Sequence, residues 1–294
     1  MAGNLIEKKI VLFAAAAGLV ASPAFGILVR DDRTQEAYLG AAQDEMFRPV
    51  GKVVRNGILR GGGVLVSERF VLTSAGNVIN TTPDEFEFEF NIGGEMYDVA
   101  SIKIHPKFYN DPINGADLAL VELAQDVPAE IKPASVYGGS DEMGREAILA
   151  GPGTSGPGAG GGLFQDGQFR AGTNMIDEVF DDGKIAWLKT DFDNPNSSTP
   201  NPLGSDTPTD MEFGMGSGDF GAPLFIELNG RKFVAGVASY FTPNALYGST
   251  NFYTRVSHYA DFFEDCGIIV EVPAPASLAM IGLGVLLSGG RRRR

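Results

Sequence analysis

The sequence has 294 residues, of which 44% are hydrophobic, with 39 glycines, 17 prolines and a formal net charge of -14 at pH 7. This length and composition exclude a disordered chain and suffice for one large β-rich domain or two small barrels. The sequence has no fixed-period repeat, phosphate-binding loop or zinc-ligand cluster, which excludes those classes. Its one cysteine, Cys266, excludes an internal disulfide.

The first 26 residues have the order of a secretory signal peptide. Lys8 and Lys9 precede an apolar run at 10–20. The small residues that follow are Ala21, Ser22, Ala24 and Gly26. A positive flank, an apolar run and a small-residue cleavage region in this order predict removal of residues 1–26 on export.

Short β-prone runs separated by glycine turns follow from residue 53 onward. The clearest are 86–92, 99–104, 118–123, 146–150, 185–189, 223–226 and 232–239. Such runs predict an antiparallel barrel or sandwich. Helical periodicity is scarce, and the segment 256–263 is the one amphipathic helix that we expect.

Two long loops interrupt the strands. Residues 151–162 are rich in glycine, and residues 191–210 are rich in Asn, Pro, Ser, Thr and Asp. The second loop has oxygen ligands for calcium at Asp191, Asp193 and Asn194, but it lacks an EF-hand pattern. We therefore expect a solvated loop, with no metal and no other cofactor.

The C-terminus carries a second processing signal. A Val-Pro-Ala-Pro-Ala-Ser segment at 272–277 precedes an apolar stretch at 278–287 and four arginines at 291–294. This order resembles the PEP-CTERM sorting tail of Gram-negative bacteria, with Ala274 where that motif usually has Glu. As a helix, residues 274–288 would span about 22 Å, less than the roughly 30 Å hydrocarbon core. The resemblance implies transient membrane contact through residues 271–294 before cleavage.

The charge of the mature chain limits its partners. Removal of residues 1–26 and of the four terminal arginines takes the formal charge from -14 to -19. An acidic protein repels nucleic acid and anionic lipid. We expect a protein exported to the cell envelope or extracellular space of a Gram-negative bacterium, with a peptide, a protein or the exopolysaccharide matrix as its partner.

Three short motifs occur in a fixed order between the two signals. In the first, Gly-Gly-Val-Leu-Val at 62–66 leads to Val-Leu-Thr-Ser-Ala-Gly-Asn-Val at 71–78. In the second, His105 and Pro106 precede Ala-Asp-Leu-Ala-Leu at 116–120. The third is Gly-Asp-Phe-Gly-Ala-Pro-Leu at 218–224.

Together these motifs resemble those of the chymotrypsin/trypsin family of serine proteases. Segments 151–156, 236–239 and 252–257 extend the resemblance, which covers about residues 50–266. It implies an all-β domain at 27–270, with two antiparallel six-stranded barrels and a short C-terminal helix.

The resemblance also implies where the catalytic groups would lie. The family's base position is Gly76, its orienting carboxylate is Asp117, and its nucleophile position is Phe220. Peptide hydrolysis by this chemistry needs a hydroxyl and an imidazole, which Phe and Gly lack. The backbone amides of Gly218 and Phe220 would be the remnant of the oxyanion hole. We expect both histidines, His105 and His258, to be structural or surface residues.

The expected cleft is narrow and apolar. By the same resemblance, Ser239, Tyr240 and Phe241 form the strand along which a peptide would lie, with Phe241 where the family often has Gly. Gly214 is the base of the specificity pocket and offers no carboxylate for a basic side chain.

Asp219 has two interpretations. In active relatives the corresponding carboxylate pairs with a newly exposed N-terminal Ile or Val. Signal cleavage after Gly26 would expose Ile27, so we predict that the Ile27 amine pairs with Asp219. Cleavage after Ala24 is the alternative, and Asp219 would then bind only its own turn.

These residues predict a catalytically inactive protease homologue that acts in binding or as a scaffold. The alternative is a secreted hydrolase that works through a non-standard site.

Overall fold

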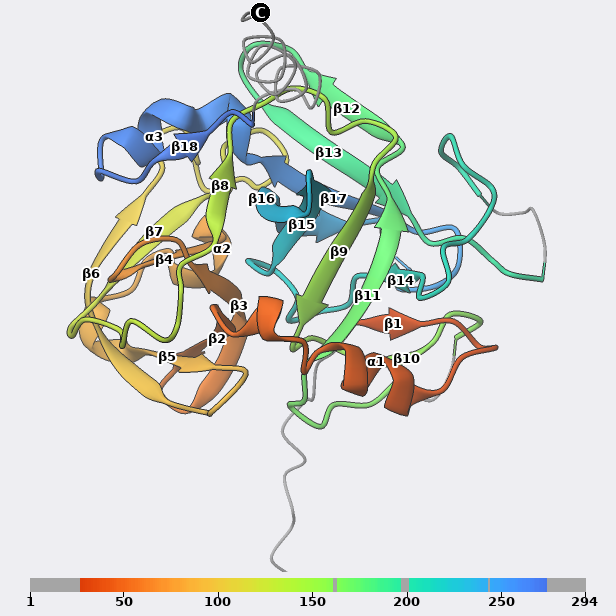
Figure 1. Cartoon of the computed structure of the whole chain (residues 1–294), viewed down its shortest axis with the longest axis horizontal. Coiled ribbons are helices and arrows are strands. Elements are labelled where there is room, and N and C mark those ends of the chain that lie inside the picture. The colour runs from red at the N-terminus through yellow and green to blue at the C-terminus, as the bar shows by residue number, and fades with distance from the viewer. Residues whose placement is uncertain (1–26, 161–162, 197–200, 243, 274–294) are drawn as a thin grey trace, which may run out of the picture.

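The computed structural model describes residues 27–160, 163–196, 201–242 and 244–273 (Figure 1). The predicted signal peptide and residues 274–294 of the predicted sorting tail lie outside the described residues. In the part of the chain that is described, no helix combines the length and apolar character needed to cross a membrane.

The first half of the domain is a closed barrel of six strands in the order β2-β3-β4-β7-β6-β5. The strands are β2 (Val50–Arg55), β3 (Ile58–Leu65), β4 (Phe70–Thr73), β5 (Phe86–Phe90), β6 (Met96–Ile104) and β7 (Ala119–Leu123). β5 alternates Phe with Glu, and its three phenylalanines are buried. A period of two places these rings on the inner face of the barrel.

The second half is a nine-stranded sheet whose main path runs β11-β9-β15-β16-β17-β13-β12 (Figure 1). Its path strands are β9 (Glu146–Gly151), β11 (Arg170–Met175), β12 (Glu178–Asp181), β13 (Ala186–Asp191), β15 (Pro223–Leu228), β16 (Arg231–Phe241) and β17 (Thr250–Arg255). The other two are β8 (Ser135–Tyr137) and β18 (Val270–Glu271). The all-β fold class is confirmed. The sheet has more strands than the six expected, because β8 and β18 pair with it in parallel and β12 extends its edge.

A three-stranded sheet joins the start of the described chain to the second half. It has the order β10-β1-β14, and its strands are β1 (Leu28–Val29), β10 (Gly156–Pro157) and β14 (Phe213–Gly214). Leu28 lies opposite Gly156 on one side and Gly214 on the other. The residues after the predicted signal peptide therefore fill the gap between two distant loops.

Helices are few and short in the part of the chain that the structure describes. They are α1 (Gln35–Ala41), α2 (Ala75–Val78) and α3 (Ala260–Glu264), with 3-10 turns η1 (Glu45–Phe47), η2 (Pro83–Glu85) and η3 (Val256–Tyr259). The helix expected at 256–263 is η3 followed by α3. It is the short helix near the C-terminal end of the domain.

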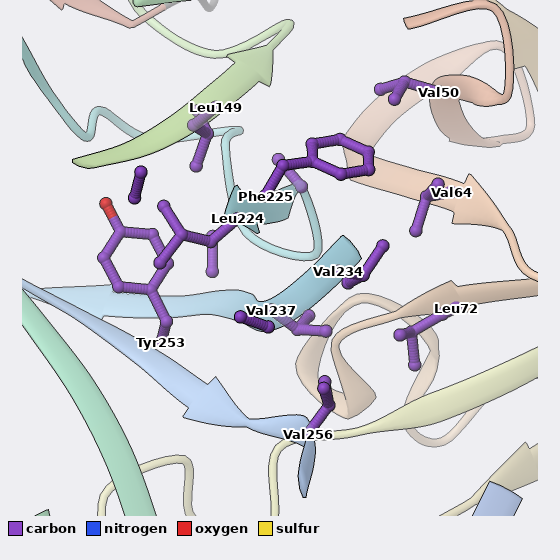
Figure 2. Close-up of a cluster of buried hydrophobic side chains, with 14 of the residues drawn as sticks. Val50, Val64, Leu72, Leu149, Leu224, Phe225, Val234, Val237, Tyr253 and Val256 are labelled. Atoms are coloured by element: carbon purple, nitrogen blue, oxygen red, sulfur yellow. The ribbon is translucent and has the colours of Figure 1, made fainter. Parts of the chain in front are cut away.

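One hydrophobic core spans both halves. It includes Val50, Val64 and Leu72 from the barrel, and Leu149 and Phe225 from the second sheet (Figure 2). A second, smaller core fills the barrel. Because the larger core is shared, the residues at the junction of the halves are held in fixed relative positions.

Candidate functional site

Asp117 lies at the junction of the two halves, two residues before β7. Its side chain is 2% exposed. Oδ1 accepts a hydrogen bond from the Gly76 amide at 2.9 Å, and Oδ2 accepts one from Ser239 Oγ at 2.6 Å. Burial raises the pKa of Asp117 above its ordinary value, although these hydrogen bonds oppose the rise. Asp117 therefore connects α2 of the barrel to β16 of the second sheet.

Gly76 is in α2, directly after β4. A Cβ added at Gly76 would meet only Asp117 Oδ1, at 3.7 Å, which is an ordinary contact. There is room for a side chain to begin here, and in this sequence the backbone amide contacts the carboxylate instead. The structure thus brings Gly76 and Asp117 together, and it adds Ser239, whose contact with Asp117 the motifs did not indicate.

Phe220 lies on the tight turn between β14 and β15. Gly218 and Gly221 flank it, with φ of 93° and 86°, in the left-handed region that glycine adopts most easily. The Phe220 carbonyl accepts hydrogen bonds from the Gly62 amide at 2.9 Å and from Asn77 Nδ2 at 2.8 Å. The turn is thereby attached to the barrel through its backbone. Within the described residues, the amides of Gly218 and Phe220 donate to no other backbone or side-chain group.

The half-buried ring of Phe220 faces a second aromatic residue at the end of β16. Its centroid is 6.0 Å from that of Phe241, and the two planes are tilted by 30°. Next to Phe241, the Tyr240 ring stacks on Phe252 with centroids 4.2 Å apart. That these residues border a narrow, apolar cleft stays a prediction.

The predicted base of the specificity pocket is occupied by a ring that the sequence did not indicate. A Cβ on Gly214 would lie 2.7 Å from Phe192 Cδ1, so the Phe192 ring packs directly on this glycine. Phe192 is fully buried with Leu28 and Tyr247. Phe192 follows β13 by one residue, and only the path of the next loop brings it to Gly214.

Asp219, the residue before Phe220 on its turn, is completely buried. Its carboxylate accepts hydrogen bonds from the amides of Gly153 and Gly216, both at 2.8 Å. Burial raises its pKa to about 7. Glycine is needed at 151 and 153 because a Cβ at either position would run into this carboxylate.

The structure places Ile27 next to the same site. A Cβ on Gly151 would clash with Asp219 Oδ1 and would lie 3.3 Å from Ile27 Cγ2. The Ile27 side chain and the Asp219 carboxylate therefore border one small space. Pairing of the Ile27 amine with Asp219 stays a prediction.

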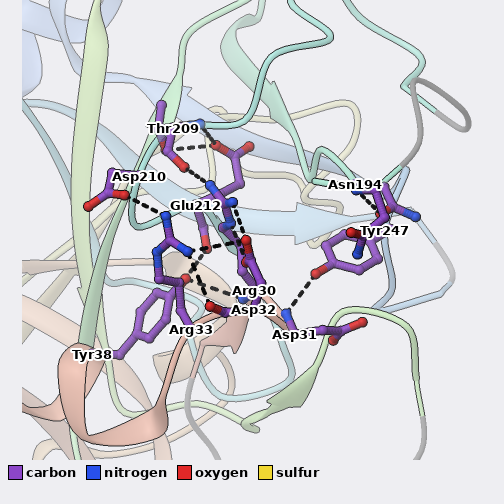
Figure 3. Close-up of polar contacts among 11 residues, drawn as sticks. Arg30, Asp31, Asp32, Arg33, Tyr38, Asn194, Thr209, Asp210, Glu212 and Tyr247 are labelled. Atoms are coloured by element: carbon purple, nitrogen blue, oxygen red, sulfur yellow. Dashed lines mark hydrogen bonds and ion pairs between the residues drawn. The ribbon is translucent and has the colours of Figure 1, made fainter.

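A polar network fixes the segment that follows Ile27 (Figure 3). Arg30 donates to the Thr209 carbonyl at 2.5 Å, and the Tyr38 hydroxyl donates to the Glu212 carbonyl at 2.7 Å. Tyr247 accepts from the Asp31 amide at 2.8 Å. These residues carry no motif, and sequence reasoning missed them because their partners are about 170 positions away or more.

Both histidines have other contacts. His105 packs edge-on against Tyr259 and Phe262, and burial lowers its pKa to about 4. His258 Nδ1 lies 3.0 Å from Asp181 Oδ2. Neither contact involves Asp117 or the Phe220 turn.

Comparison with known proteins agrees with this arrangement. A family model described as Trypsin matches residues 42–263. The fold is similar to that of neuropsin, a serine protease expressed in the limbic system of mouse brain. The TM-score is 0.55, and the match covers 76% of this chain and 95% of that chain at 18% identity. At this identity the likeness shows the fold alone.

Proposed function

This chain belongs to the trypsin family, and on that premise we propose that it is a catalytically inactive member. We further propose that it is exported and acts in binding or as a scaffold at the cell envelope or in the extracellular matrix. The observation that carries the proposal is the Phe220 turn, which supports an aromatic ring where the family places its nucleophile. Gly76, at the position of the base, supports the same conclusion.

The chemistry of acyl transfer explains why these two positions matter. The hydroxyl attacks the carbonyl, the imidazole accepts its proton, and the carboxylate orients the imidazole. Asp117 is present, but its two oxygens accept from a backbone amide and a serine hydroxyl. In a well-studied serine protease, loss of the nucleophile or the base alone lowers turnover by roughly a millionfold.

The aromatic surface supports a binding role. Phe220, on the turn before β15, and Phe241, at the end of β16, are both partly exposed and their rings lie 6.0 Å apart. Flat aromatic faces stack on the rings and apolar groups of peptides and on the faces of sugars. A peptide or protein ligand, or an exopolysaccharide, therefore fits this surface better than a polyanion does, since the chain is strongly acidic.

The first experiment measures hydrolysis of casein and fluorogenic peptides by residues 27–273. We expect the wild type and Phe220→Ala to give the same rate as the buffer blank. The Gly76→His/Phe220→Ser double variant should hydrolyse peptides faster than Gly76→His or Phe220→Ser alone, because the space at Gly76 accepts a side chain beside Asp117. Wild-type hydrolysis above the buffer blank would overturn the proposal and favour the alternative of a hydrolase with a non-standard site.

The second experiment titrates the same protein with peptide libraries and soluble exopolysaccharide. Binding that weakens at least tenfold in Phe220→Ala/Phe241→Ala supports the aromatic surface, and about 1.4 kcal/mol corresponds to that change. Met96→Ala, an exposed apolar site on the barrel, is the matched control. Absence of binding to every ligand would leave a structural role in place of the binding role.

A further inference from the structure

Four carboxyl groups lie close together at the end of β13, away from the Phe220 turn. Asp177 is in the tight turn between β11 and β12, and Asp191 is the last residue of β13. Asp193 and Glu212 belong to the connection from β13 to β14, and its described part that ends at Glu212 is called here the 201–212 loop. Asp191 and Glu212 are 1% exposed and Asp193 is 3% exposed, whereas Asp177 is half-buried.

These carboxyl groups hold the loop through its backbone. Asp191 Oδ2 accepts from the Leu203 amide at 3.1 Å, and Asp177 Oδ1 accepts from the Ser205 amide at 2.9 Å. Glu212 Oε2 accepts from both the amide and the hydroxyl of Thr209, at 2.6 Å and 2.7 Å. The expectation of a solvated loop is therefore wrong for residues 203, 205 and 209, which are docked on buried acids.

The cluster has more acceptors than donors. Asp191 Oδ1 and Asp193 Oδ1 are buried, and no N–H or O–H group of the described residues reaches either oxygen. The Asp177 and Asp191 carboxyl groups contact each other directly. Two carboxyl groups in contact cannot both remain ionised without a large repulsion, and a shared proton relieves it. Among the described residues, no three Asp, Glu, His or Cys side chains are placed to hold a metal ion.

The neighbouring charges do not neutralise the cluster. Asp206 adds repulsion on Asp193, and Tyr38 from α1 and Tyr253 from β17 face Glu212. The nearby cations are engaged elsewhere, since Arg30 binds Asp32 and the Thr209 carbonyl, and Arg33 binds Asp32 and Asp210. Burial raises the pKa of Asp177 and of Asp193 to about 7 and that of Glu212 to about 8, and it raises the pKa of Asp191 as well.

We infer that the 201–212 loop is a proton-operated latch, closed when the carboxyl cluster holds its protons and loosened when the carboxyl groups ionise. The loop leads directly into β14, where Gly214 packs on Phe192, and β14 pairs with β1. Loosening the loop therefore loosens the wall of the pocket region and the pairing of β14 with β1, which holds the N-terminal segment. The inference goes beyond the proposed function and holds whether or not the chain cleaves peptides.

The direction of the pH effect follows from linkage. A group whose pKa is higher in the docked loop than in the opened loop stabilises docking fully below its ordinary pKa of about 4. That stabilisation is lost as pH rises through the docked value. Between about pH 4.5 and 7, each such group lowers the docking constant about tenfold per pH unit, and the fall levels off above about pH 8.

Amide hydrogen exchange of residues 27–273 tests the latch. We expect the protection factors of Leu203, Ser205 and Thr209, corrected for the intrinsic pH dependence of exchange, to fall at least a hundredfold between about pH 5 and 7. The amide of Leu188, inside β13, should keep its protection factor and serves as the internal reference. Loop protection that stays constant relative to Leu188 over this range would overturn the inference.

Substitution identifies the groups responsible. In Asp177→Asn/Asp191→Asn the pH dependence should shrink by at least tenfold, because two of the titrating carboxyl groups are gone. Asp261→Asn/Glu264→Gln, on the exposed face of α3, makes the same change in charge and should keep the wild-type dependence. The latch would be contradicted if both double variants reduced the pH dependence of protection equally. Full protection restored at about pH 8 by millimolar Ca²⁺ and removed by chelator would also contradict it, since a cation would then neutralise the cluster.

Discussion

Asp219 is the residue whose chemical state bears most directly on the Phe220 turn. Its carboxylate is fully buried and has two backbone donors, Gly153 and Gly216. A buried carboxylate with only neutral donors has a raised pKa, as Asp219 has. An added α-amino group would pair with it and hold it ionised. The position of Ile27 beside the same space makes this amine the natural candidate.

Asp219→Asn tests this pairing in two versions of the protein, one beginning at Ile27 and the other at Phe25. With Ile27 first, we expect urea denaturation to show a loss of stability about 3 kcal/mol larger than with Phe25 first, because breaking a buried ion pair leaves an unpaired charge. Both versions lose the same hydrogen bond to a backbone amide, which cancels in the difference. An equal loss in the two versions would mean that Asp219 binds only its own turn.

At this scale the sequence indicates chemistry better than contacts. Gly76, Asp117 and Phe220 can be located because each lies inside a short motif of fixed spacing. Phe192 and Asn77 cannot be, since Phe192 reaches Gly214 and Asn77 reaches the Phe220 carbonyl only through the tertiary fold.

Among the elements, the turn at 218–221 depends on how closely β3 approaches it. A Cβ on Gly61 would run into the Phe220 carbonyl and into the Asn77 amide, with Asn77 Cγ at 2.9 Å. Asn77 is buried, and its amide also donates to Thr73 Oγ1 at 3.1 Å, so it cannot easily move away. The absence of a side chain at Gly61 is thus what lets the barrel bind the turn.

Gly61→Ala should therefore destabilise the domain by about 3 kcal/mol, the upper end of the usual range for overpacking. Gly40→Ala is the matched control, since Gly40 lies in helix α1 and a Cβ added there meets nothing within 4 Å. The control should leave stability unchanged or raise it by up to about 1 kcal/mol. Equilibrium urea denaturation measures the free energy of unfolding of both variants. If Gly61→Ala were as stable as Gly40→Ala, the close approach of β3 to the turn would not be what requires glycine at position 61.

The longer elements could be predicted, whereas the shortest could not. Alternating runs such as 86–90 specify strands by themselves, because their period of two buries one face. The two-residue strands β1, β10, β14 and β18 have no such pattern, and they exist only because distant partners lie beside them. The 201–212 loop is predicted to be solvated from its polar composition, and its docking depends on Asp177 of the β11–β12 turn, on Asp191 of β13 and on its own Glu212.

For the whole molecule, packing replaces covalent cross-links. Cys266 is a free thiol, and one core joins both halves of the domain. The sequence predicts this reliance on packing from its single cysteine. It does not predict that the second sheet has nine strands, since that number includes short strands paired with distant parts of the chain.

Buried ionisable groups also set the pH dependence of global stability. The carboxyl groups whose pKa is raised to about 7 or about 8 are those of Asp177, Asp193, Asp219 and Glu212. Their stabilisation is present below their ordinary values and is lost as pH rises toward 7 and 8. His105 acts in the opposite direction, because its pKa is lowered to about 4 and its contribution is lost as pH falls from 6.5. Pairing with the Ile27 amine would remove Asp219 from this set in a chain that begins at Ile27. The other three acids still oppose one histidine, so acidification toward pH 5 should stabilise the domain.

Thermal denaturation of residues 27–273 at constant ionic strength measures this balance. We expect Tm to be at least about 5 °C higher at about pH 5.5 than at about pH 8, because a net uptake of one or more protons over this interval is worth several kcal/mol. Glu212→Gln should reduce the difference, since it removes one of these buried acids, whereas Glu264→Gln on the exposed face of α3 should not. A Tm that is higher at about pH 8 would show that the buried acids are ionised and stabilised in the folded domain, which requires a positive partner for them at neutral pH.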